Sequence, residues 1–224
     1  MVRIVADAHI PFLKGVLEPH ARVLYIPGSR ISPIDIKDAD ALFIRTRTKC
    51  DKNLLSGSRV RFIASATIGA DHIDTDYCNG NGIEWRNAPG CNAASVVQYT
   101  ASAIAAIMQH SVHISRPLTL GIVGAGHIGS RIATMAGATG LKVLVNDPPR
   151  QAVEGDGAFC SLEELIRNSD IISLNLPLNR EGPYKSFYLV NHEFIERMKP
   201  ESWLINTSRG EIADTDALLQ ALHK

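Results

Sequence analysis

Three glycines lie at a spacing that suits a loop wrapped around a diphosphate group. Gly124, Gly126 and Gly129 form a GxGxxG pattern between an apolar run over 118–123 and a helical pattern over 130–138. The first glycine would permit a tight turn, the second the close approach of a pyrophosphate, and the third close packing of helix on strand. Because a helix N-terminus offers free N–H groups to an anion, the pattern predicts a nucleotide site.

An acidic side chain follows at the position expected for recognition of an adenosine ribose. Asp147 comes after a second apolar strand, 141–145, about 20 residues beyond the loop. A carboxylate there accepts hydrogen bonds from ribose hydroxyls and repels a 2′-phosphate, which favours NAD over NADP. Arg150 slightly weakens this preference. Glycines that merely end a strand remain the alternative interpretation of the motif.

Composition excludes several other classes of protein. The 224 residues are 45% hydrophobic and 21% charged, which fits one large or two modest globular domains. Lys plus Arg and Asp plus Glu both number 23, so no net charge favours nucleic acid or an anionic membrane. No leader-like segment or apolar span of membrane length is visible, so we expect a cytoplasmic protein. The four cysteines are scattered without metal-binding spacing, at Cys50, Cys78, Cys91 and Cys160. We expect them to be buried or idle free thiols that form no metal site and no disulfide.

Apolar runs alternate with helical stretches in two successive halves of the chain. In the first half the pattern predicts strands at 2–5, 23–26, 41–44, 61–66 and 83–87, with helical or loop segments at 11–19, 51–55 and 71–79. In the second half it predicts a mostly buried helix at 93–110, a polar bridge at 110–117, further strands at 171–174 and 203–205, and helices at 162–168, 191–198 and 214–223.

These elements predict an α/β protein with two doubly wound domains. We expect a flavodoxin-like substrate domain over 1–92 and a Rossmann dinucleotide-binding domain over 93–224. The strands of the second domain would be numbers one to four of the six-strand order 3-2-1-4-5-6. Strand 203–205 would then form an edge with little charge or proline to protect it, so we expect an incomplete sheet that is poorly stable or pairs with another chain.

Segments spread over nearly the whole chain resemble the erythronate-4-phosphate dehydrogenase family of the D-isomer-specific 2-hydroxyacid dehydrogenase superfamily. These segments are VADAHIPF, FIRTRTKC, ASATIGADHID, APGCNAASVVQY, VGAGHIGSR, NDPPR, LNREGPYKS and INTSRGEIADTDALL. The resemblance implies a homodimer that uses NAD to oxidise the C2 hydroxyl of 4-phospho-D-erythronate to the 2-oxo acid, in pyridoxal phosphate biosynthesis.

The same resemblance implies roles for individual residues. Arg209 matches a catalytic arginine, whose planar cation can hold the substrate carboxylate and polarise the C2 oxygen. Thr46 and Thr67 match substrate-binding hydroxyl residues. At Leu176 the family usually has a threonine, so only backbone and an apolar surface remain there. The implied NAD contacts are Gly124, Gly126, His127, Ile128, Gly129, Asp147, Leu176 and Thr207.

Two catalytic residues of the family have no counterpart in these 224 residues. The family's glutamate follows a fifth strand and its histidine a sixth, and a general base contributes about 10²–10⁴ in rate. We therefore expect a truncated chain that alone shows no turnover. His72, the nearest substitute, is expected at a solvent-facing or helix-start position. The alternatives are another 2-hydroxyacid dehydrogenase and a non-catalytic nucleotide-binding homologue.

Overall fold

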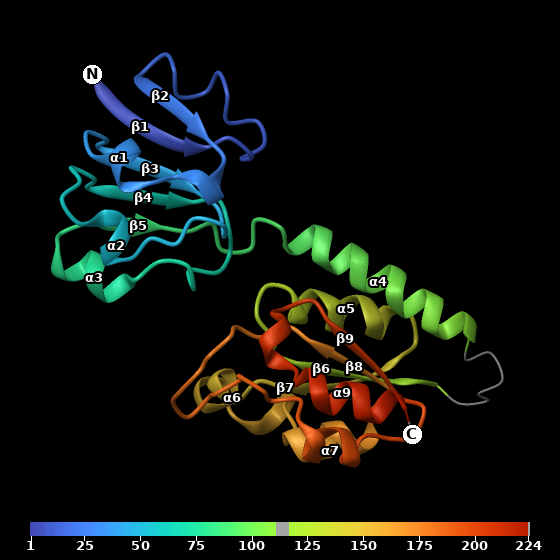
Figure 1. Cartoon of the computed structure of the whole chain (residues 1–224). Helices are drawn as coiled ribbons and strands as arrows, with labels where there is room; N and C mark the ends of the chain where they lie inside the picture. Colours follow the sequence, from blue (N-terminus) through green and yellow to red (C-terminus); the bar gives the residue numbers. More distant parts are fainter. Residues whose placement is uncertain (111–116, 224) are drawn as a thin grey trace. The chain divides into compact units, whose positions relative to one another are not determined.

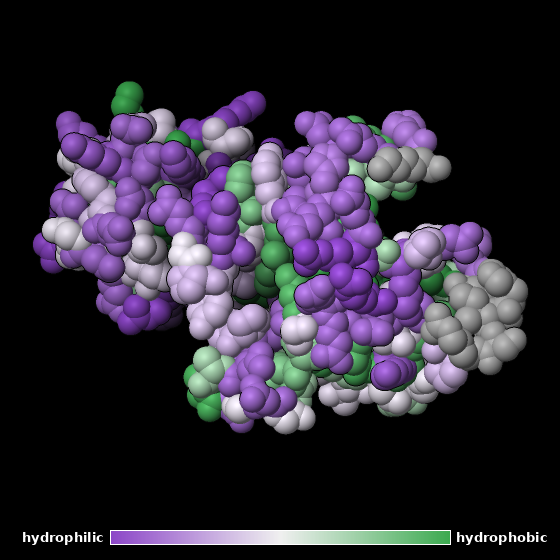
Figure 2. All heavy atoms as spheres, turned by 90° about the horizontal axis from the view of Figure 1, so that it is seen from below, coloured by the Kyte–Doolittle hydropathy of each residue, from purple (hydrophilic) through white to green (hydrophobic). Residues whose placement is uncertain are grey.

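The chain folds into two compact units, Met1–Cys91 and Asn92–Lys224. The computed structural model describes residues 1–110 and 117–223, and Figure 1 shows the elements of both units. Among these residues no helix has the length and apolar character needed to cross a membrane. On the face shown in Figure 2, hydrophobic residues are exposed in patches among predominantly hydrophilic ones.

The first unit is built on a parallel sheet of five strands in the order β2-β1-β3-β4-β5. This is the flavodoxin-like order, as predicted. The strands are β1 (Val2–Asp7), β2 (Ala21–Ile26), β3 (Ala41–Ile44), β4 (Phe62–Ser65) and β5 (Glu84–Arg86). The helical segments are η1 (Gly28–Arg30), α1 (Pro33–Ile36), α2 (Lys52–Leu55) and α3 (Thr75–Gly80).

The two faces of this sheet are covered differently. Helices α1, α2 and α3 supply Ile36, Leu55 and Cys78 to one core cluster, which includes Leu42 and Ile63 of the sheet. The opposite face has a small core of Ile4, Ala21 and Ala41. Residues 11–19 form turns, and Leu17 packs on that second face. The expected helical or loop segment is therefore a loop, and α1 is a short helix that the periodicity did not predict.

The second unit contains a parallel sheet with helices on both faces (Figure 1). Its strands are β6 (Thr119–Val123), β7 (Lys142–Asn146), β8 (Ile171–Leu174) and β9 (Trp203–Asn206). Leu120, Ile122 and Ile171 face α4 and α5, whereas Ile172 and Leu174 face α7 and α8, because side chains alternate along a strand. The helical segments are α4 (Ala93–His110), α5 (Gly129–Ala138), α6 (Pro148–Glu154), η2 (Asp156–Ala158), α7 (Leu162–Asn168), α8 (His192–Arg197), η3 (Gly210–Ile212) and α9 (Thr215–Leu222).

The strand order β7-β6-β8-β9 corrects one prediction. β8 lies beside β6, on the side away from β7, so it takes the fourth position of the six-strand order and not the third. The segment next to β7 is too short to form a strand: the Cys160 N–H donates to the Val145 carbonyl at 2.8 Å, between η2 and α7. The prediction that β9 is an edge strand is confirmed, since within the described residues it pairs only with β8.

Helix α4 has the predicted bounds but not the predicted burial. Its buried residues are Ala93, Thr100, Ile104 and Ile107, and Tyr99 is 65% exposed. A single stripe of α4 therefore packs against α5 and β9. The other positions of the helix, although rich in Ala, Val and Ile, are not buried within the described chain. Residues 111–116 of the predicted polar bridge lie outside the described residues.

Candidate active site

The carboxyl edge of the second sheet brings several of the expected site residues together. Because the four strands are parallel, the loops that follow them meet at one edge. The Gly124 N–H donates to the Asn146 carbonyl at 2.8 Å, and the Asn175 N–H donates to the Val123 carbonyl at 2.8 Å. The Leu176 N–H donates to the Ser208 hydroxyl at 3.1 Å. The ends of all four strands are thus tied to one another.

The glycine loop between β6 and α5 is shaped by two close approaches. Gly124 has φ +88°, and a Cβ there would lie 2.6 Å from the Asn175 carbonyl oxygen. A Cβ on Gly129 would collide with the Gly124 carbonyl oxygen and lie 3.1 Å from a methyl of Ile122. At Gly126, by contrast, a Cβ would meet nothing within 4 Å. The backbone therefore faces open space at the position where a pyrophosphate would approach.

The beginning of α5 offers backbone donors beside that open space. The Ser130 N–H donates to the Gly126 carbonyl at 3.1 Å, whereas the N–H groups of His127 and Ile128 have no acceptor among the described residues. Ile128 is the N-cap of the helix, and the His127 side chain is exposed. Free N–H groups at a helix N-terminus attract anions.

Asp147 caps α6 and is held against the glycine loop. One carboxylate oxygen accepts the Arg150 N–H at 3.0 Å, and the other accepts the Ala125 N–H at 2.7 Å. A carboxylate offers about four lone-pair sites, so roughly two remain for ribose hydroxyls. The cap fixes the orientation of the side chain, which is only partly buried.

A cavity of about 510 Å³ opens at this edge. Its lining includes four of the expected cofactor residues, Gly124, Gly126, Asp147 and Leu176, whereas His127, Ile128, Gly129 and Thr207 lie outside it. A larger hollow of about 890 Å³ between α8, β9 and α9 contains none of the expected site residues. The smaller cavity also has lining residues to which the sequence analysis gave no role: Pro148, Pro149, Leu162, Tyr184, Lys185 and Leu189.

The residues missed at this cavity had a visible signal in the sequence. Tyr184 and Lys185 belong to the EGPYK segment, and Pro148 and Pro149 to DPPR, both of which carried the family resemblance. The Ser186 hydroxyl donates to the Pro177 carbonyl at 2.6 Å and accepts the Asn179 N–H at 2.7 Å. This folds the segment back on itself over the pocket edge. The contact could not be predicted because it depends on the shape of the loop.

Arg209 follows β9 at the same edge and precedes η3. The Asn206 side chain brackets this turn, donating to the Arg209 carbonyl at 2.9 Å and accepting the Ser208 N–H at 3.0 Å. The Ser208 hydroxyl donates to the Leu174 carbonyl at 3.0 Å, and the Thr207 hydroxyl lies 3.4 Å from the Asn175 side-chain oxygen. The turn is therefore fixed to the end of β8, with a half-buried Arg209 side chain.

In the first unit, the expected substrate residues also share a sheet edge. Thr46 follows β3 and is exposed, and Thr67 follows β4, with Ile44 and Ser65 in register. The Thr67 hydroxyl lies 2.6 Å from the Ser65 hydroxyl and donates to the Gly69 carbonyl at 3.0 Å. The two threonines therefore lie at the carboxyl ends of neighbouring strands, where ligands of such sheets bind.

His72 does not occupy the expected solvent-facing or helix-start position. Its side chain is buried, with 8% exposed, and its Nε2 lies 2.9 Å from the Ser65 hydroxyl. Helix α3 begins later, at Thr75, with Asp74 as its cap. The segment before α3 turns inward because its backbone pairs with Cys50, and His72 completes a chain of polar contacts that ends at Thr67.

A histidine–carboxylate pair at the end of β1 was missed. The His9 Nδ1 lies 3.1 Å from Oδ1 of Asp7, a buried carboxylate that also accepts the Gly28 N–H at 3.1 Å. The Arg45 guanidinium donates to the His9 carbonyl at 3.2 Å. The sequence analysis gave neither residue a role, although a spacing of two places both residues close together where the strand ends.

Comparison with known proteins identifies the family. Residues 98–224 match the model described as "D-isomer specific 2-hydroxyacid dehydrogenase, NAD binding domain". The chain belongs to this family. The predicted family, the Rossmann-type fold and NAD as the cofactor of the second domain are confirmed.

The chain is also similar to individual D-isomer specific 2-hydroxyacid dehydrogenases. It is 46% identical over 222 residues to the erythronate-4-phosphate dehydrogenase of Bacteroides fragilis, covering 99% of this chain and 64% of the relative. The enzyme of that name from Pseudomonas putida is 41% identical over 219 residues, with 98% and 57% covered. The chain thus spans less than two thirds of the length of these relatives.

Solved structures of the family share the fold. D-lactate dehydrogenase from Aquifex aeolicus, complexed with NAD and lactic acid, has a TM-score of 0.82 and 30% identity, covering 98% of this chain and 73% of that one. NAD⁺-bound 3-phosphoglycerate dehydrogenase from Entamoeba histolytica has a TM-score of 0.82 and 26% identity, covering 99% and 76%.

Proposed function

We propose that this chain carries the substrate-binding and NAD-binding parts of an erythronate-4-phosphate dehydrogenase. The observation that supports this most strongly is the 46% identity over 99% of the chain, which extends through both units and not the NAD-binding domain alone. The reaction would be oxidation of the C2 hydroxyl of 4-phospho-D-erythronate to the 2-oxo acid. The runner-up is a dehydrogenase for another 2-hydroxy acid, since structural relatives are named for lactate and 3-phosphoglycerate.

In this proposal the second unit binds the cofactor at the carboxyl edge of its sheet. The open backbone at Gly126 and the N–H groups of His127 and Ile128 hold the pyrophosphate. Asp147 accepts hydrogen bonds from the adenosine ribose, and Leu176 provides an apolar wall of the cavity. The chemistry supplied by bound NAD is acceptance of the hydride from C2.

The residues with substrate-binding roles in this proposal are Arg209 in the second unit and Thr46 and Thr67 in the first. Arg209, fixed in its turn by Asn206, binds the carboxylate and polarises the C2 oxygen, so that developing charge is stabilised. Thr46 donates a hydrogen bond to an oxygen of the phosphorylated acid, and Thr67 contacts the acid through its hydroxyl oxygen, since its hydrogen is donated to the Gly69 carbonyl. The working form is proposed to be a cytoplasmic homodimer, and light scattering on the purified protein tests the dimer.

The test is NAD reduction with 4-phospho-D-erythronate, D-lactate and 3-phosphoglycerate as alternative substrates. It is run on this chain, from which we expect no turnover, and on the product of the whole open reading frame that encodes it. In the form that turns over, Arg209→Ala should lower kcat by about 10²-fold or more, because a fixed charge on the transition state is lost. The control is Arg167→Ala, in an exposed pair with Glu163.

Each outcome separates the candidate functions. A strong preference for 4-phospho-D-erythronate supports the proposal, and a preference for another acid supports the runner-up. If NADH binds but neither this chain nor the product of the whole open reading frame turns over any of the three substrates, the non-catalytic nucleotide-binding alternative is supported. If Arg209→Ala and Arg167→Ala have equal effects, the role given to Arg209 is wrong.

A further inference from the structure

Asp147 and Arg150 lie on one turn but should have opposite effects on an NADP molecule. A carboxylate beside the ribose repels a 2′-phosphate, whereas an arginine near that position can accommodate it. The two residues are linked directly, since Asp147 accepts the Arg150 N–H at 3.0 Å. The preference for NAD over NADP therefore depends on whether the Arg150 guanidinium is free to bind a phosphate.

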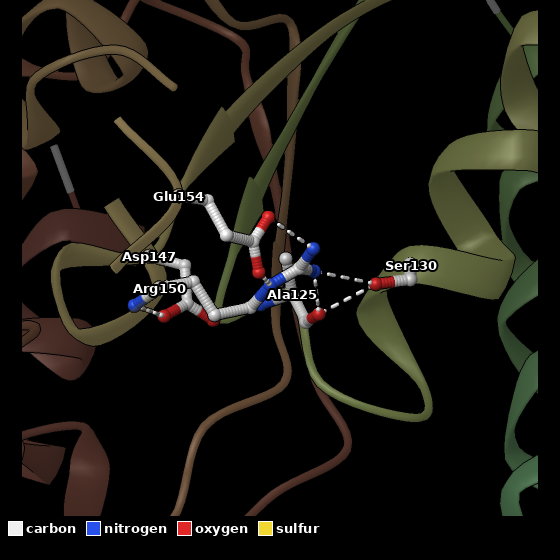
Figure 3. Close-up of polar contacts among 5 residues, drawn as sticks. All are labelled: Ala125, Ser130, Asp147, Arg150 and Glu154. Carbon is white, nitrogen blue, oxygen red and sulfur yellow. Dashed lines mark hydrogen bonds and ion pairs between the residues drawn. The ribbon is translucent and has the colours of Figure 1, made fainter. Parts of the chain in front are cut away.

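The structure shows a guanidinium that is almost fully engaged (Figure 3). Its Nε and Nη2 donate to the two carboxylate oxygens of Glu154 at 2.7 and 2.8 Å. Its Nη1 donates to the Ala125 carbonyl at 2.5 Å and to the Ser130 hydroxyl at 3.0 Å. Since arginine carries five N–H donors, these contacts leave one without an acceptor among the described residues.

The same contacts tie Arg150 to the glycine loop. Ala125 lies between the glycines and also donates its N–H to Asp147 at 2.7 Å, while the Ser130 hydroxyl donates to the Ala125 carbonyl at 2.5 Å. Figure 3 shows the guanidinium turned toward Ala125 and Ser130, with Glu154 against its other edge. The fork geometry allows arginine to satisfy a carboxylate and a loop carbonyl at once.

Other Arg–Glu pairs four residues apart show what is particular to this one. Arg167 with Glu163 in α7 and Arg197 with Glu193 in α8 bridge successive helical turns. Within the described residues, the hydrogen bonds of these two arginine side chains stay inside their own helices. Arg150 alone of the three also reaches a loop of the cofactor site.

We propose that Glu154 is a specificity-determining residue that keeps the site selective for NAD. Glu154 pairs with the charge of Arg150 and holds its side chain on the glycine loop. A 2′-phosphate therefore finds no free cation to offset its repulsion by Asp147. Arg150 is a positioning residue for the loop. The inference rests on the binding of NAD by this domain and is independent of the substrate and of turnover.

The experiment measures the dissociation constants of NADH and NADPH by fluorescence titration of the 224-residue chain. In Glu154→Ala and Glu154→Gln the Kd of NADPH should fall about tenfold, because one charge-assisted hydrogen bond becomes available. The Kd of NADH should change less than about twofold, since NADH has no 2′-phosphate to meet the freed cation. Higher salt should reduce the gain in NADPH affinity.

Three further variants isolate the cause. Arg150→Ala combined with Glu154→Ala should abolish the gain for NADPH. Arg150→Ala alone should weaken NADH binding, because the Ala125 carbonyl loses a donor. Glu193→Ala removes the comparable carboxylate from α8 and should leave both affinities unchanged. Circular dichroism and thermal melting confirm that each variant is folded.

The results distinguish failure of this inference from failure of the proposed function. If the unaltered chain binds NADH and both Glu154 variants keep its ratio of NADPH to NADH affinity, the inference is wrong and cofactor binding stands. If the double variant keeps the gain, Arg150 is not the cation responsible and the inference is wrong. If the unaltered chain binds no NADH, cofactor binding fails and the inference fails with it.

Discussion

At the scale of single residues, the glycines of the loop have separable roles. A methyl group on Gly129 would collide with the Gly124 carbonyl, whereas one on Gly126 would meet nothing in the protein within 4 Å. Gly129→Ala should therefore destabilise the second unit, by about 1–3 kcal/mol as for other overpacked sites. Gly126→Ala should change the free energy of unfolding by less than about 0.5 kcal/mol. It should still weaken NADH binding, because the methyl group occupies the space where the pyrophosphate would lie.

Urea unfolding and NADH titration of the two glycine variants check this separation. Gly137→Ala, within α5, is a matched control because a Cβ there also meets nothing within 4 Å. It should keep the affinity for NADH and raise stability by about 0.5–1 kcal/mol, because alanine has a higher helix propensity than glycine. Equal loss of stability in Gly126→Ala and Gly129→Ala would contradict the assignment of one glycine to the ligand and the other to packing.

At the scale of elements, a buried thiol lies where the segments leading into α2 and α3 pair. Cys50 forms an isolated parallel bridge with Ile73, and its carbonyl accepts the Asp74 N–H at 2.8 Å. Burial, with smaller effects of Cys78 and Asp51, raises the pKa of the Cys50 thiol to about 12. The predicted character of Cys50 as an idle, buried thiol agrees with this pKa, since a thiol that stays protonated is a poor nucleophile.

That pKa predicts a loss of stability in alkali. In the unfolded chain the thiol loses its proton above pH 9, whereas the folded chain keeps it until about pH 12. Between these values the unfolded state binds fewer protons, so stability falls as pH rises, by roughly 1.4 kcal/mol per pH unit for this group. Unfolding measured from pH 8 to 11 should show a shallower decline in Cys50→Ala than in the exposed-site control Cys91→Ala. Identical slopes would show that Cys50 does not titrate in this way.

At the scale of the whole molecule, the two units have separate cores and one tryptophan each. Trp85 packs against the core of the first unit, and Trp203 lies in β9 of the second. Trp85→Phe and Trp203→Phe therefore report on the units one at a time. Saturating NAD⁺, at about 100 times its Kd, should stabilise the second unit by about 2.7 kcal/mol and leave the first unchanged, because only the second contains the cofactor site.

Thermal unfolding followed by tryptophan emission checks this prediction. The melting temperature should rise with NAD⁺ in Trp85→Phe, where Trp203 reports, and stay constant in Trp203→Phe. A nucleotide that lacks the adenosine, nicotinamide mononucleotide, is the control ligand and should shift neither transition strongly. Equal shifts in both variants would mean that the units unfold as one.

The sequence by itself determined the order of the strands and of most helices along the chain, the glycine loop, the acid after β7 and the family. It could do so because these features depend on residues close together in the chain: apolar periodicity, glycine spacing and the distance from loop to acid. The bounds of α4, α7 and β8 were predicted residue for residue. Two helices were not predicted. α1 has four residues, too few to show a helical periodicity, and α6 buries none of its residues, so it has no apolar stripe.

Only the tertiary structure decided how those elements are used. β8 takes its place in the sheet by pairing with β6 and not beyond β7, and the exposure of α4 depends on which stripe meets α5 and β9. Hydrogen bonds between separate turns or elements also hold His72 inward against Ser65. Others of this kind hold Arg150 against Glu154 and Ala125. Hydrogen bonds and burial at such contacts depend on three-dimensional placement, which residue types and spacing do not encode locally.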